Sequence, residues 1–173
     1  MNSNTQQSRI LAVSLSSRGF GYAVMEDGGA LVDYGKTTVK GEKNALALAR
    51  IGKVIARSVP DQLVLQDVNA RGTFRCSRIK RLDRRIVALS RKRKLRVAKI
   101  AARELRRLLL GSESGTKLEM AELMAKRFPD ELSARLPAGR RPWESEDARM
   151  DIFGAVGLAV AHRQRQEDLP TRA

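Results

Sequence analysis

The sequence predicts an α/β fold with one mixed five-stranded sheet, in which three antiparallel strands precede parallel crossovers and helices cover both faces. Three observations lead to this prediction. The chain begins with strand-like apolar segments separated by glycine-containing turns, and after residue 40 segments with helical and strand-like periodicity alternate. The last long segment is apolar on nearly every side, as expected of a helix buried against a sheet. The expected order of elements is β-β-β-α-β-α-β, followed by helices.

The first three strands are expected within the first 40 residues. Residues 9–16 (RILAVSLS) form an apolar run bounded by polar residues, which is typical of a buried strand. A turn containing Gly21 precedes a second strand that begins at residues 22–25. The sequence EDGG at residues 26–29 is a strong hairpin signal, and residues 31–39 alternate as a third strand should. These short connections predict antiparallel neighbours.

Helices and strands alternate in the middle of the chain. Residues 45–55 are apolar at helical intervals, and residues 62–68 (QLVLQDV) resemble a buried strand, which indicates a right-handed crossover to a parallel strand. Helical spacing returns at Ile79, Leu82, Ile86 and Leu89. Residues 95–100 are a candidate fifth strand, and a helix is expected over residues 101–110.

The last third of the chain predicts two further helices. A capping box at residues 116–119 (TKLE) opens a helix that ends near Phe128. Residues 135–143 (RLPAGRRPW) are expected to form a loop. The final helix is expected to begin at Ser145 or Glu146.

Length and composition indicate one cytoplasmic domain. The chain of 173 residues fits a single domain over residues 9–166, with a disordered N-terminal tail at residues 1–8 and a C-terminal tail at residues 167–173. No secretory signal is visible, and no apolar run approaches the roughly 20 residues that span a membrane. Cys76 is the single cysteine, so no intrachain disulfide can form. We therefore expect a cytoplasmic protein without a membrane partner.

The positive charge of the chain is concentrated in one segment. Of the net charge of +15, residues 71–108 contribute +14, with 16 Lys and Arg against two acids. Because like charges repel, this clustering favours a polyanionic partner over a merely solvated helix face. Contacts to phosphates would dominate, so affinity should fall steeply with salt. The predicted nucleic-acid contacts are Arg71, Arg75, Arg78, Lys80, Arg81, Arg84, Arg85, Arg91, Lys92, Arg93 and Lys94.

Several segments, in order, resemble the RuvC-type Holliday-junction resolvases of the RNase H-like superfamily. Residues 10–24 (ILAVSLSSRGFGYAV) resemble their first strand and hairpin, and residues 62–68 their fourth strand. Residues 116–127 (TKLEMAELMAKR) and 151–162 (DIFGAVGLAVAH) resemble the two helices that close that fold. The resemblance implies an RNase H-like fold, DNA along the helix that follows the fourth strand, and a homodimer.

The resemblance also implies a catalytic site, which this chain matches in one position only. Such nucleases use carboxylates to hold two divalent ions about 3.5–4 Å apart. Ser14 stands in place of the first-strand Asp, Gln66 in place of the fourth-strand Glu, and Gly154 in place of the second terminal Asp. Asp151 alone matches. Because Mg²⁺ requires charged oxygen ligands, no metal or other cofactor is expected.

The first hypothesis is therefore a catalytically impaired or inactive nuclease homologue that binds structured or double-stranded nucleic acid through its basic helix, with DNA favoured and RNA as the alternative. The second is an active Mg²⁺- or Mn²⁺-dependent endonuclease of the junction-resolving type, in which Asp67 and Asp147 act as substitute ligands beside Asp151. Asp67 would point to the sheet face opposite Gln66, because strand side chains alternate. The third is an assembly protein whose basic face contacts an acidic partner or RNA.

One residue has two open interpretations, and three others are expected to have structural roles. Phe74 either stacks on a base as a wedge or anchors its loop to the core. Trp143 is expected to pin its loop onto the core, and His162 to have a structural role. Glu146 suits the dipole of the last helix without any metal.

Overall fold

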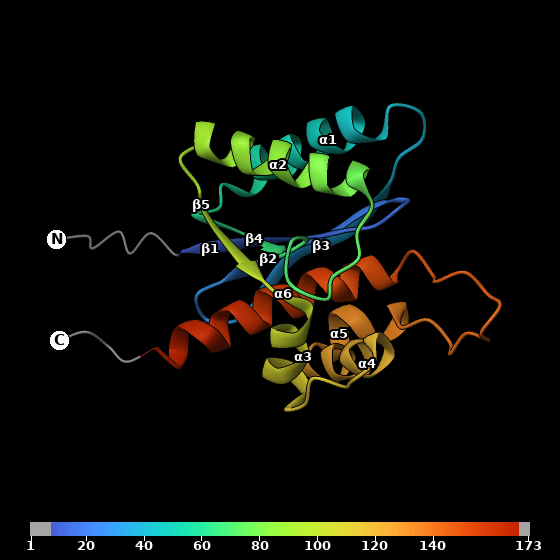
Figure 1. Ribbon diagram of the computed structural model, residues 1–173. Helices are drawn as coiled ribbons and strands as arrows, with labels where there is room; N and C mark the ends of the chain where they lie inside the picture. The colour runs from blue at the N-terminus through green and yellow to red at the C-terminus, as the bar shows by residue number, and fades with distance from the viewer. Residues whose placement is uncertain (1–7, 170–173) are drawn as a thin grey trace, which may run out of the picture.

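A computed structural model describes residues 8–169 of the chain and shows one five-stranded sheet with the strand order β3-β2-β1-β4-β5 (Figure 1). Strands β1, β2 and β3 pair antiparallel, whereas β1 with β4 and β4 with β5 pair parallel. This confirms the predicted mixed sheet. The strands are β1 (Arg9–Leu15), β2 (Gly19–Glu26), β3 (Leu31–Thr38), β4 (Gln62–Gln66) and β5 (Arg96–Ile100).

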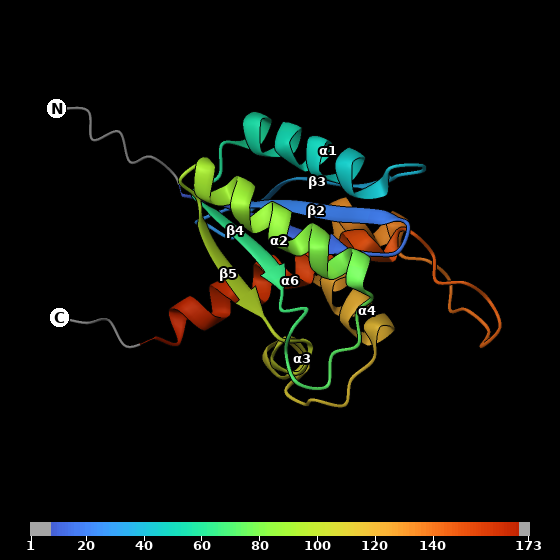
Figure 2. The same ribbon diagram turned by 45° about the horizontal axis from the view of Figure 1, so that its top comes forward.

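Helices cover both faces of the sheet, as predicted (Figures 1 and 2). One face carries α1 (Lys43–Ser58) and α2 (Ser77–Lys92). The other carries the remaining helices, with a short 3₁₀ turn (Ser133–Arg135) after α5. These are α3 (Ala102–Leu110), α4 (Lys117–Arg127), α5 (Pro129–Leu132) and α6 (Met150–Glu167).

Strand β1 is apolar from Ile10 to Val13 because both of its faces are covered. Ile10 and Ala12 pack in the core on the α6 side, whereas Leu11 and Val13 pack in the core beneath α1 and α2. Side chains of a strand alternate between faces, so the next residue on the α6 side is Ser14. The alternation of β1 thus directs Ser14 toward α6.

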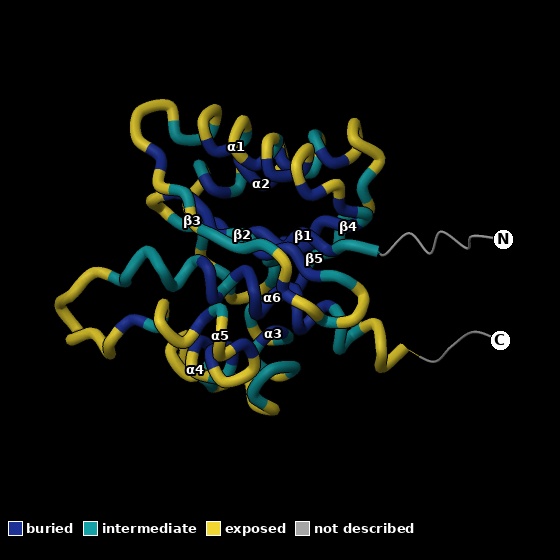
Figure 3. Tube along the Cα trace, turned by 180° about the vertical axis from the view of Figure 1, so that it is seen from behind, coloured by how far each residue is buried: buried dark blue, intermediate teal, exposed yellow. Residues whose placement is uncertain are grey.

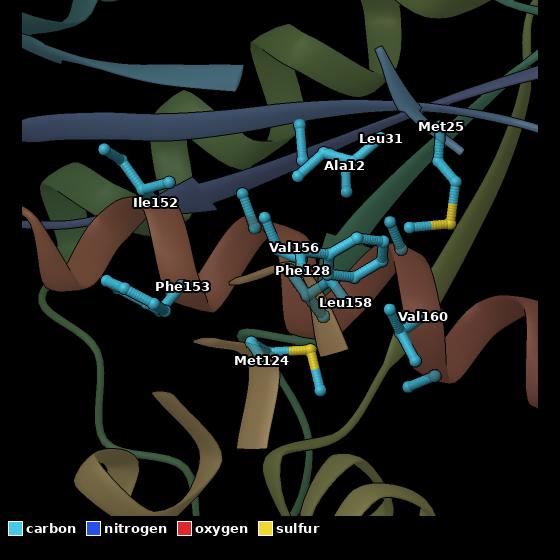
Figure 4. Close-up of a cluster of buried hydrophobic side chains, with 14 of the residues drawn as sticks. Ala12, Met25, Leu31, Met124, Phe128, Ile152, Phe153, Val156, Leu158 and Val160 are labelled. Carbon is cyan, nitrogen blue, oxygen red and sulfur yellow. The ribbon is translucent and has the colours of Figure 1, made fainter. Parts of the chain in front are cut away.

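Helix α6 is the centre of the core on its side of the sheet. Its residues Ile152, Phe153 and Val156 are buried, and the helix lies between the sheet and the layer of α3 and α4 (Figure 4). Burial on nearly all sides explains why this segment shows little amphipathic pattern. Within residues 8–169, no helix combines the length and the apolar character that crossing a bilayer requires.

Two predictions are wrong in this region, the start of α6 and the burial of Trp143. Helix α6 begins at Met150 rather than at Ser145 or Glu146, because Asp147 accepts a hydrogen bond from the backbone N–H of Arg149 (2.8 Å) and holds the preceding residues in a turn. Trp143 does not pin its loop to the core, since it is 76% exposed. The predicted capping box is present, with Thr116 accepting from the backbone N–H of Glu119.

Most of each predicted terminal tail lies beyond the described part of the chain. Residues 1–7 and 170–173 fall outside it. Within it, Glu167 ends α6, and the backbone N–H of Asp27 in the β2–β3 turn donates to the carbonyl of Ser8 (3.1 Å).

His162 has a structural position at the far end of α6. It is 5% exposed, and its Nε2 lies 2.6 Å from the side-chain amide of Gln62. With the amide nitrogen of Gln62 donating to Nε2, the amide oxygen accepts from Arg96 (2.9 Å). Burial, together with the charges of Arg165 and Arg96, lowers the pKa of His162 to about 4. The neutral imidazole is therefore the form that the fold accommodates.

The lowered pKa of His162 predicts a pH-dependent stability. The unfolded chain binds a proton on this residue near pH 6.5 and the folded chain only near pH 4, so protons favour unfolding within that window. We expect the free energy of unfolding to fall by up to roughly 3 kcal/mol as the pH drops from 6.5 to 4. Urea denaturation across this range should show a smaller decrease for His162→Gln. An identical decrease in both proteins would contradict this prediction.

Candidate functional site

A cavity of about 230 Å³ lies at the carboxyl ends of β1 and β4, between the sheet and helices α3, α4 and α6. Parallel strands in α/β folds commonly present binding sites at this edge. The four positions that the resemblance singled out all line this cavity, although they come from three elements, β1, β4 and α6, in widely separated parts of the chain. They are Ser14, Gln66, Asp151 and Gly154.

Ser14 and Gly154 face each other directly across the interface of β1 and α6. A Cβ atom added to Gly154 would lie 2.6 Å from Oγ of Ser14 and 3.2 Å from its Cβ. The hydroxyl of Ser14 therefore fills the space that a side chain at position 154 would need. A side chain at position 154 would therefore require a smaller residue at position 14 or a shift of α6.

Asp151 is largely buried in the first turn of α6. One of its carboxylate oxygens accepts a hydrogen bond from Oγ of Ser16 (2.7 Å). Burial raises the pKa of Asp151 above the ordinary value of an aspartate, and the hydrogen bond from Ser16 opposes that shift. This carboxylate is thus held by the protein's own hydroxyl group.

Arg75 enters the same cavity from the segment between β4 and α2. Its Nη2 donates to Oε1 of Gln66 (3.2 Å), and its Nη1 lies 3.4 Å from the carbonyl oxygen of Leu15. The guanidinium group therefore occupies the ends of β1 and β4, next to one of the positions at which a nuclease of the RuvC type would hold a carboxylate. The sequence placed Arg75 among the surface contacts to nucleic acid and missed this position.

Lys117 and Glu146 form an ion pair where α4 lines the cavity. Nζ of Lys117 lies 2.9 Å from Oε2 of Glu146 and 3.1 Å from Oε1. Both residues also line a second cavity of about 300 Å³ beside the loop of residues 137–140. Lys117 was not among the predicted site residues, because a lysine in the first turn of a helix gives no signal of its own.

The two proposed substitute ligands lie elsewhere. Asp67 follows β4 and accepts a hydrogen bond from the backbone N–H of Asn69 (3.0 Å), and it does not line the cavity of Asp151. Asp147 lines the second cavity, where the guanidinium of Arg149 (2.7 Å) lowers its pKa to about 2. The structure thus does not gather Asp67, Asp147 and Asp151 around one point.

The residues of the cavity do not suit a pair of divalent ions. Ser14 and Gln66 carry no charge, Gly154 offers no ligand, and the carbonyl oxygen of Gln66 already accepts from Arg75. Within residues 8–169, no three His, Cys, Asp or Glu side chains form a group that would hold a metal. Mg²⁺ needs several hard, anionic oxygen ligands, and a guanidinium beside them would compete with the ion.

The basic segment has a buried face and an exposed face (Figure 3). Helix α2 buries Ile79, Leu82 and Ile86 against the sheet, and its single acid, Asp83, is also buried and pairs with Lys99 (2.6 Å). The exposed face of α2 and the turn after it therefore carry positive charge alone. The exposed cations are Arg71, Arg81, Arg84, Arg85, Arg91, Lys92, Arg93 and Lys94.

The other predicted contacts are partly buried. Arg78 donates to Oδ1 of Asn44 (3.1 Å) and to the carbonyl of Ser17 (3.2 Å), so it ties α2 to α1 and to the β1–β2 turn. Lys80 is partly exposed on α2. Phe74 is 96% exposed, which excludes its interpretation as an anchor to the core.

The comparisons with known proteins give a consistent fold. No family model matches the sequence, and no curated protein shows significant similarity to it. Among solved structures, RuvC from Thermus thermophilus superposes with a TM-score of 0.67 at 14% identity, over 92% of this chain and 95% of that one. The same protein in complex with a Holliday junction substrate gives a TM-score of 0.64 at 13% identity, with the same coverage.

A second resolvase has a similar fold. The yeast mitochondrial Holliday junction resolvase superposes with a TM-score of 0.66 at 11% identity, over 93% of this chain and 80% of that one. Together with the strand order β3-β2-β1-β4-β5, these similarities show that the chain has a RuvC-like fold of the RNase H-like class.

Proposed function

We propose that this protein binds double-stranded or branched DNA through the exposed face of α2 and the turn that follows it, and that it does not cut the DNA. The observation that carries the proposal is the unbalanced charge of this face. Within the described residues, none of its exposed arginines and lysines forms an ion pair. Such a surface repels itself unless a polyanion neutralises it.

The dimensions of α2 suit a nucleic-acid backbone. A helix of 16 residues extends about 24 Å, and its exposed cations can follow several phosphates. Phosphate contacts carry no sequence information, so binding should depend strongly on salt and weakly on sequence. The exposed ring of Phe74, two residues after Gly72 in the segment before α2, is accessible for stacking on a base.

The RuvC-like fold makes branched DNA the first substrate to test. The Thermus protein with this fold has a structure in complex with a Holliday junction substrate. A four-way junction brings several phosphate backbones close together, which suits a basic helix. The stoichiometry of the complex, measured by light scattering, would separate a monomer from the homodimer that the resemblance implies.

The proposal that the protein does not cut DNA rests on the chemistry of the cavity. Hydrolysis of a phosphodiester with two metal ions requires carboxylates on both sides of the scissile phosphate. Of the corresponding positions only Asp151 is acidic, and its oxygen already accepts from Ser16. The hydroxyl of Ser16 holds this carboxylate in place, and a guanidinium bonds to Gln66 at the ends of β1 and β4, which supports binding without hydrolysis.

One experiment tests both parts of the proposal. Labelled four-way junction, duplex and single-stranded DNA, and duplex RNA, would be incubated with the protein in Mg²⁺, in Mn²⁺ and in chelator. We expect a salt-sensitive complex with the junction and the duplex that is equally strong in chelator, and no cleavage above background. Cleavage that depends on the metal and disappears in Asp151→Asn would overturn the proposal in favour of an active endonuclease.

The same assay distinguishes the remaining alternatives. Tighter binding of RNA than of DNA would assign the basic face to RNA. Absence of binding to every nucleic acid at low salt would contradict the proposal and favour a protein partner with an acidic surface.

A further inference from the structure

We propose that the cavity at the ends of β1 and β4 holds one phosphate group on the guanidinium of Arg75, so that an arginine supplies the positive charge for which the RuvC-like fold elsewhere uses metal ions. This inference deepens the proposed function, and the part of it that concerns nucleic acid rests on the proposed function. The shared chemistry is that of a phosphate, which either belongs to the backbone of a bound nucleic acid or is free in solution as phosphate or a mononucleotide.

The first support is that Arg75 lacks a counter-ion. Both of its acceptors, the carbonyl of Leu15 and the amide oxygen of Gln66, are neutral and lie at 3.4 and 3.2 Å. No carboxylate of residues 8–169 lies within ion-pair distance of it. A guanidinium has five N–H donors in a planar fork, so most of them remain available here. A partly buried cation of this kind favours an anion that accepts two parallel hydrogen bonds.

The second support is the set of donors around Arg75. Ser14 and Ser17 line the same cavity, and within the described residues neither hydroxyl donates to another group. Lys117 also lines the cavity, and its partner Glu146 is partly exposed, so an incoming anion can share this ammonium group. A volume of about 230 Å³ exceeds the roughly 30 Å³ of one water molecule several-fold. Hydroxyl, ammonium and guanidinium donors around one space suit the oxygens of a phosphate.

The third support is the route from the cavity to the basic face. Arg75 lies two residues before α2 begins, and the segment that carries it leaves the sheet at the end of β4 (Figure 2). A backbone that follows the exposed cations of α2 toward its first turn would therefore approach the segment of Arg75. The cavity and the basic face are then parts of one phosphate-binding surface.

The carboxylates of Asp151 and Glu146 line the same cavity and oppose the binding of an anion, and that of Glu146 is paired with Lys117. The proposal therefore predicts opposite changes in phosphate affinity when each of the charges of Arg75 and Asp151 is removed. Removal of the charge of Arg75 should weaken phosphate binding, and removal of the charge of Asp151 by Asp151→Asn should strengthen it. A merely structural role of either residue would not produce opposite changes in affinity at equal stability.

The first arm measures the affinity for a four-way DNA junction in chelator. Arg75→Gln is expected to weaken binding about tenfold, the change that one lost charge-assisted hydrogen bond produces, and to reduce the slope of log K against log salt by about 0.9. Asp151→Asn is expected to strengthen binding by about threefold, less than a full hydrogen bond. Arg127→Gln removes an exposed arginine of α4 as the matched control and should change affinity less than twofold.

The second arm measures inorganic phosphate and adenosine 5′-monophosphate by thermal unfolding and calorimetry, without nucleic acid. Stabilisation by millimolar phosphate that Arg75→Gln abolishes and Arg127→Gln retains would support the site, even if no nucleic acid bound. Dependence on Arg75 in the second arm alone would assign a free phosphate as the ligand, and in the first arm alone a backbone phosphate. Arg75→Lys keeps the charge without the fork and serves if Arg75→Gln is unstable. Equal affinities of wild type and Arg75 variants in both arms would overturn the proposal.

Discussion

Replacement of Arg91, Lys92, Arg93 and Lys94 together by Gln is expected to weaken binding to duplex DNA about 100-fold at 0.15 M salt. These side chains are exposed at the end of α2 and in the turn before β5. Each phosphate contact contributes roughly 0.7 decades of affinity at this salt concentration through release of counter-ions. About 100-fold therefore corresponds to three of the four cations in contact. The slope of log K against log salt should fall by about 0.9 for each lost contact.

A pair of doubly substituted proteins controls for net charge and for helix termini. Arg91→Gln/Lys92→Gln and Lys126→Gln/Arg127→Gln each remove two adjacent cations from the last turn of a helix, α2 in the first case and α4 in the second. Because α4 lies on the other face of the sheet, the second pair should change affinity less than twofold. Equal losses in the two pairs would mean that net charge, not the basic face, determines binding. Fluorescence anisotropy at three salt concentrations measures the affinity and the slope of log K against log salt.

The second large effect concerns Gly21, which allows β2 to contact the start of α6. A Cβ atom added at this position would overlap the backbone carbonyl of Asp151 and approach the backbone nitrogen of Ile152 to 2.7 Å. Neither neighbour is a movable side-chain end, so α6 would have to shift away from the sheet. We expect Gly21→Ala to lower the free energy of unfolding by about 3 kcal/mol, the upper range for overpacking of a core.

Gly28 provides the matched control for this substitution. It lies in the hairpin turn between β2 and β3, where an added Cβ atom meets nothing within 4 Å. Gly28→Ala should therefore change stability by no more than about 0.5 kcal/mol. Denaturation in urea measures both variants, and equal midpoints would show that the contact between β2 and α6 is not as close as described. Because the displaced backbone includes Asp151, Gly21→Ala should also disturb the cavity.

Much of the fold could be predicted from local sequence. The apolar run of β1, the hairpin sequence before Gly29 and the capping box at Thr116 are local signals, and the structure contains all three elements. Gly29 has a φ angle of +82°, which glycine adopts without strain, so the position of that turn was encoded in a few residues. Pattern and turn chemistry were sufficient here because neighbouring residues determine them.

The start of α6 could not be predicted in the same way. Residues 145–149 contain acids that suit a helix N-terminus, and that signal placed the helix too early. In the structure Asp147 instead bonds to Arg149, and the helix begins at Met150. Two competing local arrangements were available, and the hydrogen bonds between Asp147 and Arg149 accompany the turn instead of an earlier start of the helix.

The fold class, the concentration of positive charge after β4 and the absence of acids at positions 14, 66 and 154 could be predicted from the amino-acid sequence. The folded chain was needed to show that Arg75 turns inward to the amide of Gln66, that Asp67 and Asp147 remain apart from Asp151, and that Phe74 is exposed. Periodicity reports which face of a helix or strand is buried, because that depends on residues two to four positions apart. The direction of a loop side chain depends on partners brought from distant segments, and these meet only when the sheet and α6 have assembled.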